Sequence, residues 1–218
     1  FMEHLRDTGY QTHGVGKMHF SPDPLRMWGY ESRDVAEEVY HDGNDYYEYL
    51  KEQGYSHILE DGGLRSEYYY IPQPSQFPQE DHQSTWVADR SIAFLKERDR
   101  SRPFFLWSSW VKPHPPFESP VPWSKLYRPE ESGYPYNPED SDDLLCIWNR
   151  IQNRYKWRDN GCDGNLQRTM RAAYMACVSF VDYNIGRIFE ELGDEIDNTL
   201  VILTSDHGEM LGDYGSFG

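Results

Sequence analysis

The sequence predicts an α/β fold in which helices flank a mostly parallel sheet. Two apolar runs, at residues 104–107 and 199–205, have the length and the aromatic or β-branched content of strands buried on both faces. A helical pattern precedes each run, at residues 85–98 and at residues 166–192. Helix followed by strand, repeated along a chain, is typical of a sheet whose strands are mostly parallel.

The chain begins with a predicted short helix at residues 3–6 and a break at residues 9–10. A segment at residues 14–20 follows and carries Lys17 and His19. Residues two positions apart on an extended strand point to the same side. We therefore expect this ammonium group and this imidazole to lie on one face.

Three longer helices are predicted further along. Residues 45–53 predict a short helix that ends at Gly54, and residues 85–98 predict an amphipathic helix. The longest helix is expected at residues 166–192, before Gly193, because it carries a single apolar stripe. The stripe consists of Met170, Ala173, Tyr174, Cys177, Val181, Ile185 and Ile188.

Length and composition fit one α/β domain. The 218 residues suffice for a sizeable core, and no linker divides them. Aromatic residues make up 16 % of the chain, so much of the core must consist of Tyr, Trp and Phe. Two irregular stretches are long, at residues 58–84 and 118–163. Loops of that length in a compact domain are usually functional or poorly ordered.

Charge and residue usage argue against several classes of partner. A formal net charge of −16 disfavours binding to nucleic acid or to an anionic membrane through a broad basic face. No apolar run approaches the roughly 20 residues that span a bilayer. The three cysteines are not closely paired, so they indicate neither a disulfide framework nor a zinc site.

Three loops that follow strand-like runs carry groups suited to an oxyanion or a metal. They contain Lys17 with His19, His114 among prolines, and Asp206 with His207. Open α/β sheets bind ligands beyond the carboxyl ends of their strands. Each group also has a structural alternative: a solvated lysine, a packed imidazole, or an aspartate that caps a turn.

Five motifs occur in one order along the chain. They are Gly-Tyr-Gln-Thr at 9–12 leading into Gly-Lys-Met-His at 16–19, Lys-Pro-His-Pro-Pro-Phe at 112–117, Val-Asp-Tyr-Asn-Ile-Gly-Arg at 181–187, Thr-Ser-Asp-His-Gly-Glu at 204–209 and Leu-Gly-Asp-Tyr-Gly at 211–215. This ordered set resembles the sulfatases of the alkaline phosphatase superfamily, although many members have His where Tyr214 stands. The resemblance implies an alkaline-phosphatase-like sulfatase core.

The resemblance also implies a role for each candidate residue. Lys17 would place a fixed positive charge on the sulfate, and His19 would act on the hydroxyl of the nucleophile. His114 would face the leaving-group oxygen as a hydrogen-bond donor or general acid. Asp206 and His207 would supply half of the ligands of one divalent cation, with Ca²⁺ as the first choice and Mg²⁺ or Mn²⁺ as alternatives. Many relatives have Asn where His207 stands.

The family nucleophile is a formylglycine made from the Cys or Ser of a Cys-x-Pro-x-x-Arg type motif. None of Cys146, Cys162 and Cys177 stands in such a motif, and no Ser does. In the family this motif precedes the Gly-Lys-x-His segment. We therefore expect residues 1–218 to be part of a single sulfatase catalytic domain, truncated at both ends and inactive alone, with the formylglycine outside the fragment. A periplasmic or secreted location is also expected.

The function expected from the resemblance is metal-dependent hydrolysis of sulfate esters, of carbohydrate or aryl type, to an alcohol and sulfate. The partner would be a sulfated small molecule or glycan. A phosphonate monoester or phosphodiester hydrolase of the same superfamily is an alternative, because the tetrahedral anion has nearly the same shape. A non-catalytic relative that binds sulfated glycans is a third interpretation.

Overall fold

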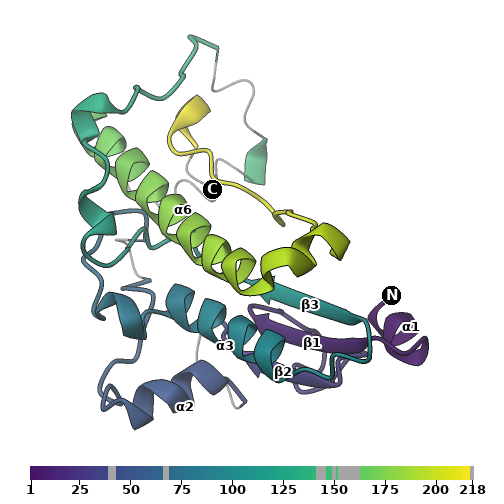
Figure 1. The fold of residues 1–218 in the computed structure, drawn as a ribbon. Coiled ribbons are helices and arrows are strands. Elements are labelled where there is room, and N and C mark those ends of the chain that lie inside the picture. Colours follow the sequence, from purple (N-terminus) through teal and green to yellow (C-terminus); the bar gives the residue numbers. More distant parts are fainter. Residues whose placement is uncertain (39–42, 66–68, 141–145, 149–150, 152–162, 217–218) are drawn as a thin grey trace. The chain divides into compact units, whose positions relative to one another are not determined.

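The computed structural model describes residues 1–38, 43–65, 69–140, 146–148, 151 and 163–216. The chain divides into two units. The first unit comprises residues 1–61, 79–111 and 181–200, and the second comprises residues 62–78, 112–180 and 201–218. Figure 1 labels the helices and strands of both.

A three-stranded parallel sheet forms the centre of the first unit. Strand β1 (Gln11–Gly16) lies between β2 (Ser32–Val35) and β3 (Phe104–Ser109), and both neighbours run parallel to it. The register pairs Gly16 with Val35 on one side and with Ser109 on the other. The carboxyl ends of all three strands therefore meet at one edge, as the predicted parallel sheet requires.

The predicted helices are confirmed, with ends that differ by one or two residues. They are α1 (Met2–Asp7), α2 (Asp45–Glu52), α3 (Gln83–Glu97) and α6 (Gly164–Leu192). In the first unit, the C-terminal part of α6 packs against α3 through a shared apolar cluster. The cluster consists of Ala88, Phe94, Leu95, Ile188 and Leu192. Phe104 and Leu106 pack against it from β3, so it joins the helices to the sheet.

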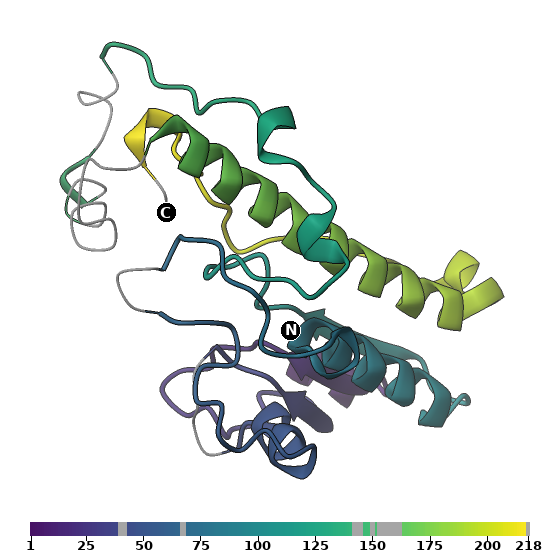
Figure 2. The same cartoon turned by 90° about the vertical axis from the view of Figure 1, so that its left-hand side faces the viewer.

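The second unit is built on the N-terminal part of α6. Its core consists of Tyr69, Tyr70, Phe117, Met170 and Cys177, and Phe117 and Met170 are fully buried. The C-terminal residues, yellow in Figures 1 and 2, run along this part of the helix. Although α6 has 29 residues, neither it nor any other helix in the described part of the chain is both long and apolar enough to cross a membrane.

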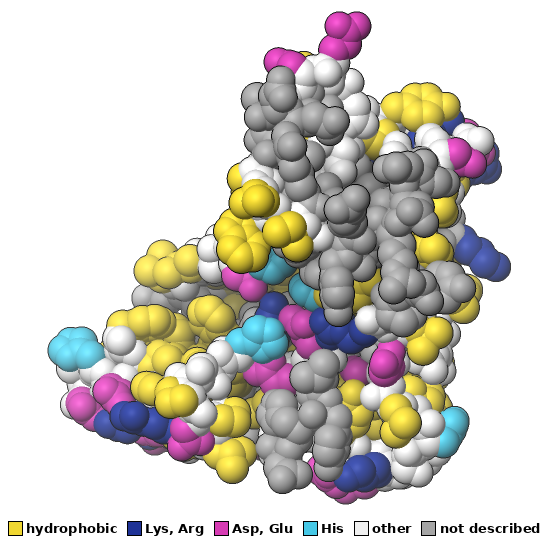
Figure 3. Space-filling model, turned by 180° about the vertical axis from the view of Figure 1, so that it is seen from behind, with side chains coloured by type: hydrophobic (Ala, Val, Ile, Leu, Met, Phe, Trp, Pro, Cys, Tyr) yellow, Lys and Arg dark blue, Asp and Glu magenta, His cyan; other side chains and the backbone are white. Residues whose placement is uncertain are grey.

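The strand predicted at residues 199–205 is wrong. This segment is irregular, and it pairs with none of the three strands in the described residues. Leu200, Ile202 and Leu203 are 85 %, 76 % and 82 % exposed. An apolar run indicates a tendency to be buried, but a strand also needs a neighbour that accepts its backbone hydrogen bonds. Further exposed hydrophobic side chains lie among charged ones on the face shown in Figure 3.

The expected extended segment at residues 14–20 is also corrected. Strand β1 ends at Gly16, so Lys17 and His19 follow the strand instead of lying on it. Gly16 has a φ of +90°, and a Cβ there would lie 1.8 Å from the carbonyl oxygen of Ser109. A residue with a Cβ would clash there, so only glycine fits. The left-handed φ of Gly16 turns the chain at the end of β1.

The environments of two cysteines predict different reactivities. Cys177 is 1 % exposed, and burial raises the pKa of its thiol to about 12. Its Sγ donates to the carbonyl oxygen of Glu118, whereas Cys146 is exposed. Because the thiolate is the reactive form and a raised pKa keeps the thiol protonated, we expect iodoacetamide at neutral pH to alkylate Cys146 and spare Cys177. Peptide mapping by mass spectrometry measures the extent of alkylation at each of the two cysteines.

Unfolding in guanidinium chloride is the control for this labelling experiment, and it should make both thiols react. Equal labelling of Cys146 and Cys177 in the native chain would contradict the buried position of Cys177. Cys162 lies outside the described residues.

Candidate functional site

Lys17 and His19 lie on the turn that follows β1, at the carboxyl edge of the sheet. The backbone N–H of Lys17 donates to the carbonyl oxygen of Ser109, 3.1 Å away, which continues the contact between β1 and β3. His19 has a φ of +47°, in the left-handed region. Both residues therefore lie beyond the carboxyl end of β1.

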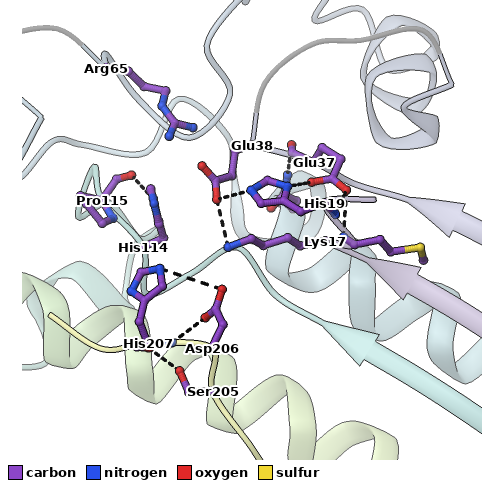
Figure 4. A network of polar contacts seen from close by, with 12 residues as sticks. Lys17, His19, Glu37, Glu38, Arg65, His114, Pro115, Ser205, Asp206 and His207 are labelled. Atoms are coloured by element: carbon purple, nitrogen blue, oxygen red, sulfur yellow. Dashed lines mark hydrogen bonds and ion pairs between the residues drawn. The ribbon is translucent and has the colours of Figure 1, made fainter. Parts of the chain in front are cut away.

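One carboxylate contacts both of these candidate residues. Oε1 of Glu38 lies 3.1 Å from Nζ of Lys17 and 3.3 Å from Nε2 of His19 (Figure 4). The side chains of Lys17 and Glu38 are 12 % and 9 % exposed, so the contact is largely shielded from water. An oxygen that carries negative charge can thus interact with the ammonium and the imidazole together.

The neighbouring carboxylate, Glu37, contacts the same turn from its other side. Its Oε1 accepts hydrogen bonds from the backbone N–H groups of Met18 and His19, at 2.8 and 2.7 Å. Its Oε2 lies 2.5 Å from Nδ1 of His19. The carboxylate can only accept, so Nδ1 carries a proton, while Nε2 is the ring nitrogen that lies 3.3 Å from Oε1 of Glu38.

Sequence reasoning missed both glutamates. They follow β2 by two and three residues, in a sequence, Val-Ala-Glu-Glu, that belongs to no motif quoted above. The available signal was weak: an acidic pair directly after a short run with strand character. The parallel register of β1 and β2 gives that pair its place beside residues 17–19.

In the second unit, His114 belongs to a proline-rich loop with a fixed geometry. Its Nδ1 donates to the carbonyl oxygen of Pro115 at 2.7 Å, and the hydroxyl of Tyr69 lies 3.4 Å from its Nε2. The buried side chain of Lys112 binds the backbone of this loop. Its Nζ donates to the carbonyl oxygens of Pro116 and Gly62, at 2.6 and 3.2 Å.

Lys112 also forms a buried ion pair. Its Nζ lies 3.3 Å from Oε1 of Glu118, and the two side chains are 4 % and 2 % exposed. Lys112 is therefore a structural residue of the loop.

Asp206 and His207 lie on the loop near the C-terminus, also in the second unit. Oδ1 of Asp206 accepts from the backbone N–H of His207 at 3.0 Å, and Nδ1 of His207 donates to the carbonyl oxygen of Gly208 at 3.1 Å. The side chains are 67 % and 55 % exposed. The rings of His114 and His207 are 6.0 Å apart between centroids, so this unit brings three predicted residues together (Figure 4).

The pair of Asp206 and His207 fits part of a divalent-cation site. Oδ2 of Asp206 and Nε2 of His207 are 3.9 Å apart. Bonds of about 2.0–2.1 Å to nitrogen and about 2.3–2.6 Å to oxygen allow both atoms to bind one cation at that separation. Within the described ranges, no three His, Cys, Asp or Glu residues are grouped to hold a metal, so further ligands are required.

The structure therefore brings the predicted residues together in two groups, one in each unit. Lys17 and His19 share the carboxylate of Glu38, and His114 lies with Asp206 and His207. The roles assigned to these five residues remain predictions. The first group is suited to an oxyanion, and the second to a cation and to proton transfer at Nε2 of His114.

Comparison with known proteins places the chain among related sequences. A family model described as Sulfatase matches residues 1–217. An arylsulfatase of Clostridium perfringens is 29 % identical over 96 % of the chain and 46 % of its own length. The multifunctional alkaline phosphatase superfamily protein PehA of Trinickia caryophylli is 29 % identical over 98 % of the chain and 48 % of its own length. The chain thus spans about half the length of these curated relatives.

A solved structure shares the fold. The phosphonate monoester hydrolase SpPMH of Silicibacter pomeroyi matches all of the chain and 49 % of its own chain, with a TM-score of 0.74 and 22 % identity. This similarity confirms the predicted parallel sheet with flanking helices. At this level of identity it supports the fold alone.

The buried ion pair of Lys112 predicts a large effect on stability. We expect Lys112→Met to lower the free energy of unfolding by about 3 kcal/mol, because it removes the ammonium that faces the buried carboxylate of Glu118. The double variant Lys112→Met/Glu118→Leu should recover only part of this loss: no buried charge remains, but the carbonyl oxygens of Pro116 and Gly62 still lose the ammonium as donor. Urea denaturation measures all three proteins.

Lys96 offers a matched control. Its Nζ also lies 3.3 Å from a carboxylate oxygen, that of Glu191, but its side chain is 60 % exposed. Lys96→Met should lower the free energy of unfolding by no more than about 0.5 kcal/mol, because water screens the exposed pair. Equal effects at Lys112 and Lys96 would show that the buried pair does not stabilise the loop.

Proposed function

Because this chain belongs to the sulfatase family, we propose that the whole protein is a metal-dependent hydrolase of sulfate esters, of carbohydrate or aryl type. One observation carries the proposal within the chain. A single carboxylate oxygen of Glu38 lies within 3.1 and 3.3 Å of the cationic group of Lys17 and of Nε2 of His19. A sulfate oxygen has the charge and size to take the same two contacts.

Lys17 and His19 have distinct roles in this proposal. Lys17 places a fixed positive charge against the developing charge of the anion, an electrostatic contribution that is largest where water is excluded. His19 exchanges a proton at Nε2, because its Nδ1 proton is held by Glu37. The nucleophile, a formylglycine by family resemblance, is proposed to lie outside these 218 residues.

The residues of the second unit contribute a general acid and metal ligands. The proton on Nδ1 of His114 is donated to Pro115, so Nε2 is the atom that protonates the leaving-group oxygen. Asp206 and His207 would hold a divalent cation, with Ca²⁺ proposed first and Mg²⁺ or Mn²⁺ as alternatives. The bound cation supplies Lewis-acid stabilisation of the sulfate oxygens.

The test compares two esters with the same aryl leaving group, a sulfate and a phosphonate monoester. The protein is expressed from the complete reading frame that contains this chain. We expect a higher kcat/KM for the sulfate, loss of turnover with a chelator, and recovery when Ca²⁺ is added back. Lys17→Ala should lower kcat by about 100-fold or more, because it removes a preorganised charge.

Lys96→Ala is the control variant, and its kcat should equal that of the wild type, since Lys96 pairs with Glu191 on the surface. A higher kcat/KM for the phosphonate would instead establish the phosphonate hydrolase alternative. Binding of sulfated glycans without turnover of either ester would establish the non-catalytic interpretation.

A further inference from the structure

Glu37 is a buried carboxylate that contacts three hydrogen-bond donors of the turn after β1. Two are backbone N–H groups, those of Met18 and His19, and the third is Nδ1 of His19. The side chain of Glu37 is only 7 % exposed. A buried carboxylate requires such donors, because a charged oxygen without them would be strongly destabilising.

The two oxygens of Glu37 divide these contacts between backbone and ring. Oε1 accepts both backbone bonds, which is sufficient to hold the turn. Oε2 lies 2.5 Å from Nδ1 of His19. The contact with the ring is thus additional to the two that hold the turn, and it fixes a proton on Nδ1.

Glu37 is itself anchored to the sheet and to α3. It follows β2 by two residues, and its carbonyl oxygen accepts from Nε2 of Gln83, at 3.3 Å, in the first turn of α3. His19 keeps a left-handed φ of +47°, a conformation that costs energy and persists only where the surroundings impose it. The position of the imidazole is thus tied, through Glu37, to the most regular part of the first unit.

We propose that Glu37 is the positioning residue of His19. It holds the proton on Nδ1, directs Nε2 to the reacting groups, and stabilises the imidazolium when Nε2 takes up a proton. This is the arrangement by which a carboxylate orients a catalytic imidazole in general acid–base catalysis. The inference rests on the proposed hydrolysis and adds to it a residue that none of the sequence motifs includes.

Glu37→Gln in the protein from the complete reading frame tests the proposal. The amide keeps one oxygen for the two backbone donors but removes the acceptor from Nδ1. We expect kcat to fall by about 10- to 100-fold with KM nearly unchanged, and the melting temperature to change little. A residue that only holds the turn would leave kcat unaltered in this variant.

A double-mutant cycle shows whether Glu37 acts through His19. We expect His19→Gln and His19→Gln/Glu37→Gln to have the same kcat, because the carboxylate has no effect once its imidazole is absent. Multiplicative losses in the double variant, or wild-type kcat in Glu37→Gln, would overturn the proposal.

Asp34→Asn is the matched control, since Asp34 is another carboxylate of the same sheet that contacts an imidazole. Its Oδ2 lies 3.1 Å from Nε2 of His13 in the same sheet. Burial favours the neutral form of Asp34, but hydrogen bonds from His13 and Arg90 outweigh burial and lower the pKa of the carboxyl. The same change from carboxylate to amide at Asp34 should leave kcat within about twofold, whereas a loss equal to that of Glu37→Gln would refute a specific role for Glu37.

A proton NMR measurement separates this proposal from the proposed function. The hydrogen bond from Nδ1 of His19 to Glu37 should give a downfield N–H resonance that is absent in both His19→Gln and Glu37→Gln. A wild-type protein that shows the resonance but turns over neither ester would refute the proposed function while confirming the contact. A wild-type protein that turns over sulfate without this resonance would refute the role of Glu37.

Discussion

The parallel pairing of β1 with β2 is the constraint that brings Lys17 and His19 to Glu37 and Glu38. Parallel strands end at the same edge of a sheet, so the residues that follow them become neighbours. Residues 17–19 follow β1, and Glu37 and Glu38 follow β2. The ammonium and the imidazole thereby meet two carboxylates from a segment 18 or more residues away. An antiparallel pairing would place the two loops at opposite edges.

The three histidines of the candidate site share one hydrogen-bonding arrangement. In each, Nδ1 is directed to an acceptor: Glu37 for His19, the carbonyl of Pro115 for His114 and the carbonyl of Gly208 for His207. Each ring therefore carries a proton on Nδ1, and Nε2 is its second nitrogen. This is the atom that a proton transfer or a metal bond requires, and its partner on Nδ1 determines the orientation of the ring.

A buried ion pair underlies the proline-rich loop that carries His114 in the second unit. Lys112 and Glu118 lie almost fully inside, and the ammonium additionally binds two backbone carbonyls. Such a pair stabilises a loop only when most of its hydrogen-bonding capacity is used, because desolvation opposes the Coulomb attraction. The loop that carries His114 is consequently held by a lysine that takes no part in the proposed chemistry.

The sequence by itself determined the helices, the parallel α/β class and the family, because hydrophobic periodicity and ordered motifs are local properties of the chain. It also identified Lys17, His19, His114, Asp206 and His207 as candidates, although their chemical roles await experiment. Only the tertiary structure decided that residues 199–205 form no strand among the described residues, and that β1 ends before Lys17. It alone revealed Glu37 and Glu38. Strand pairing and the approach of carboxylates to a turn depend on residues distant in the sequence, so no local sequence pattern predicts these contacts.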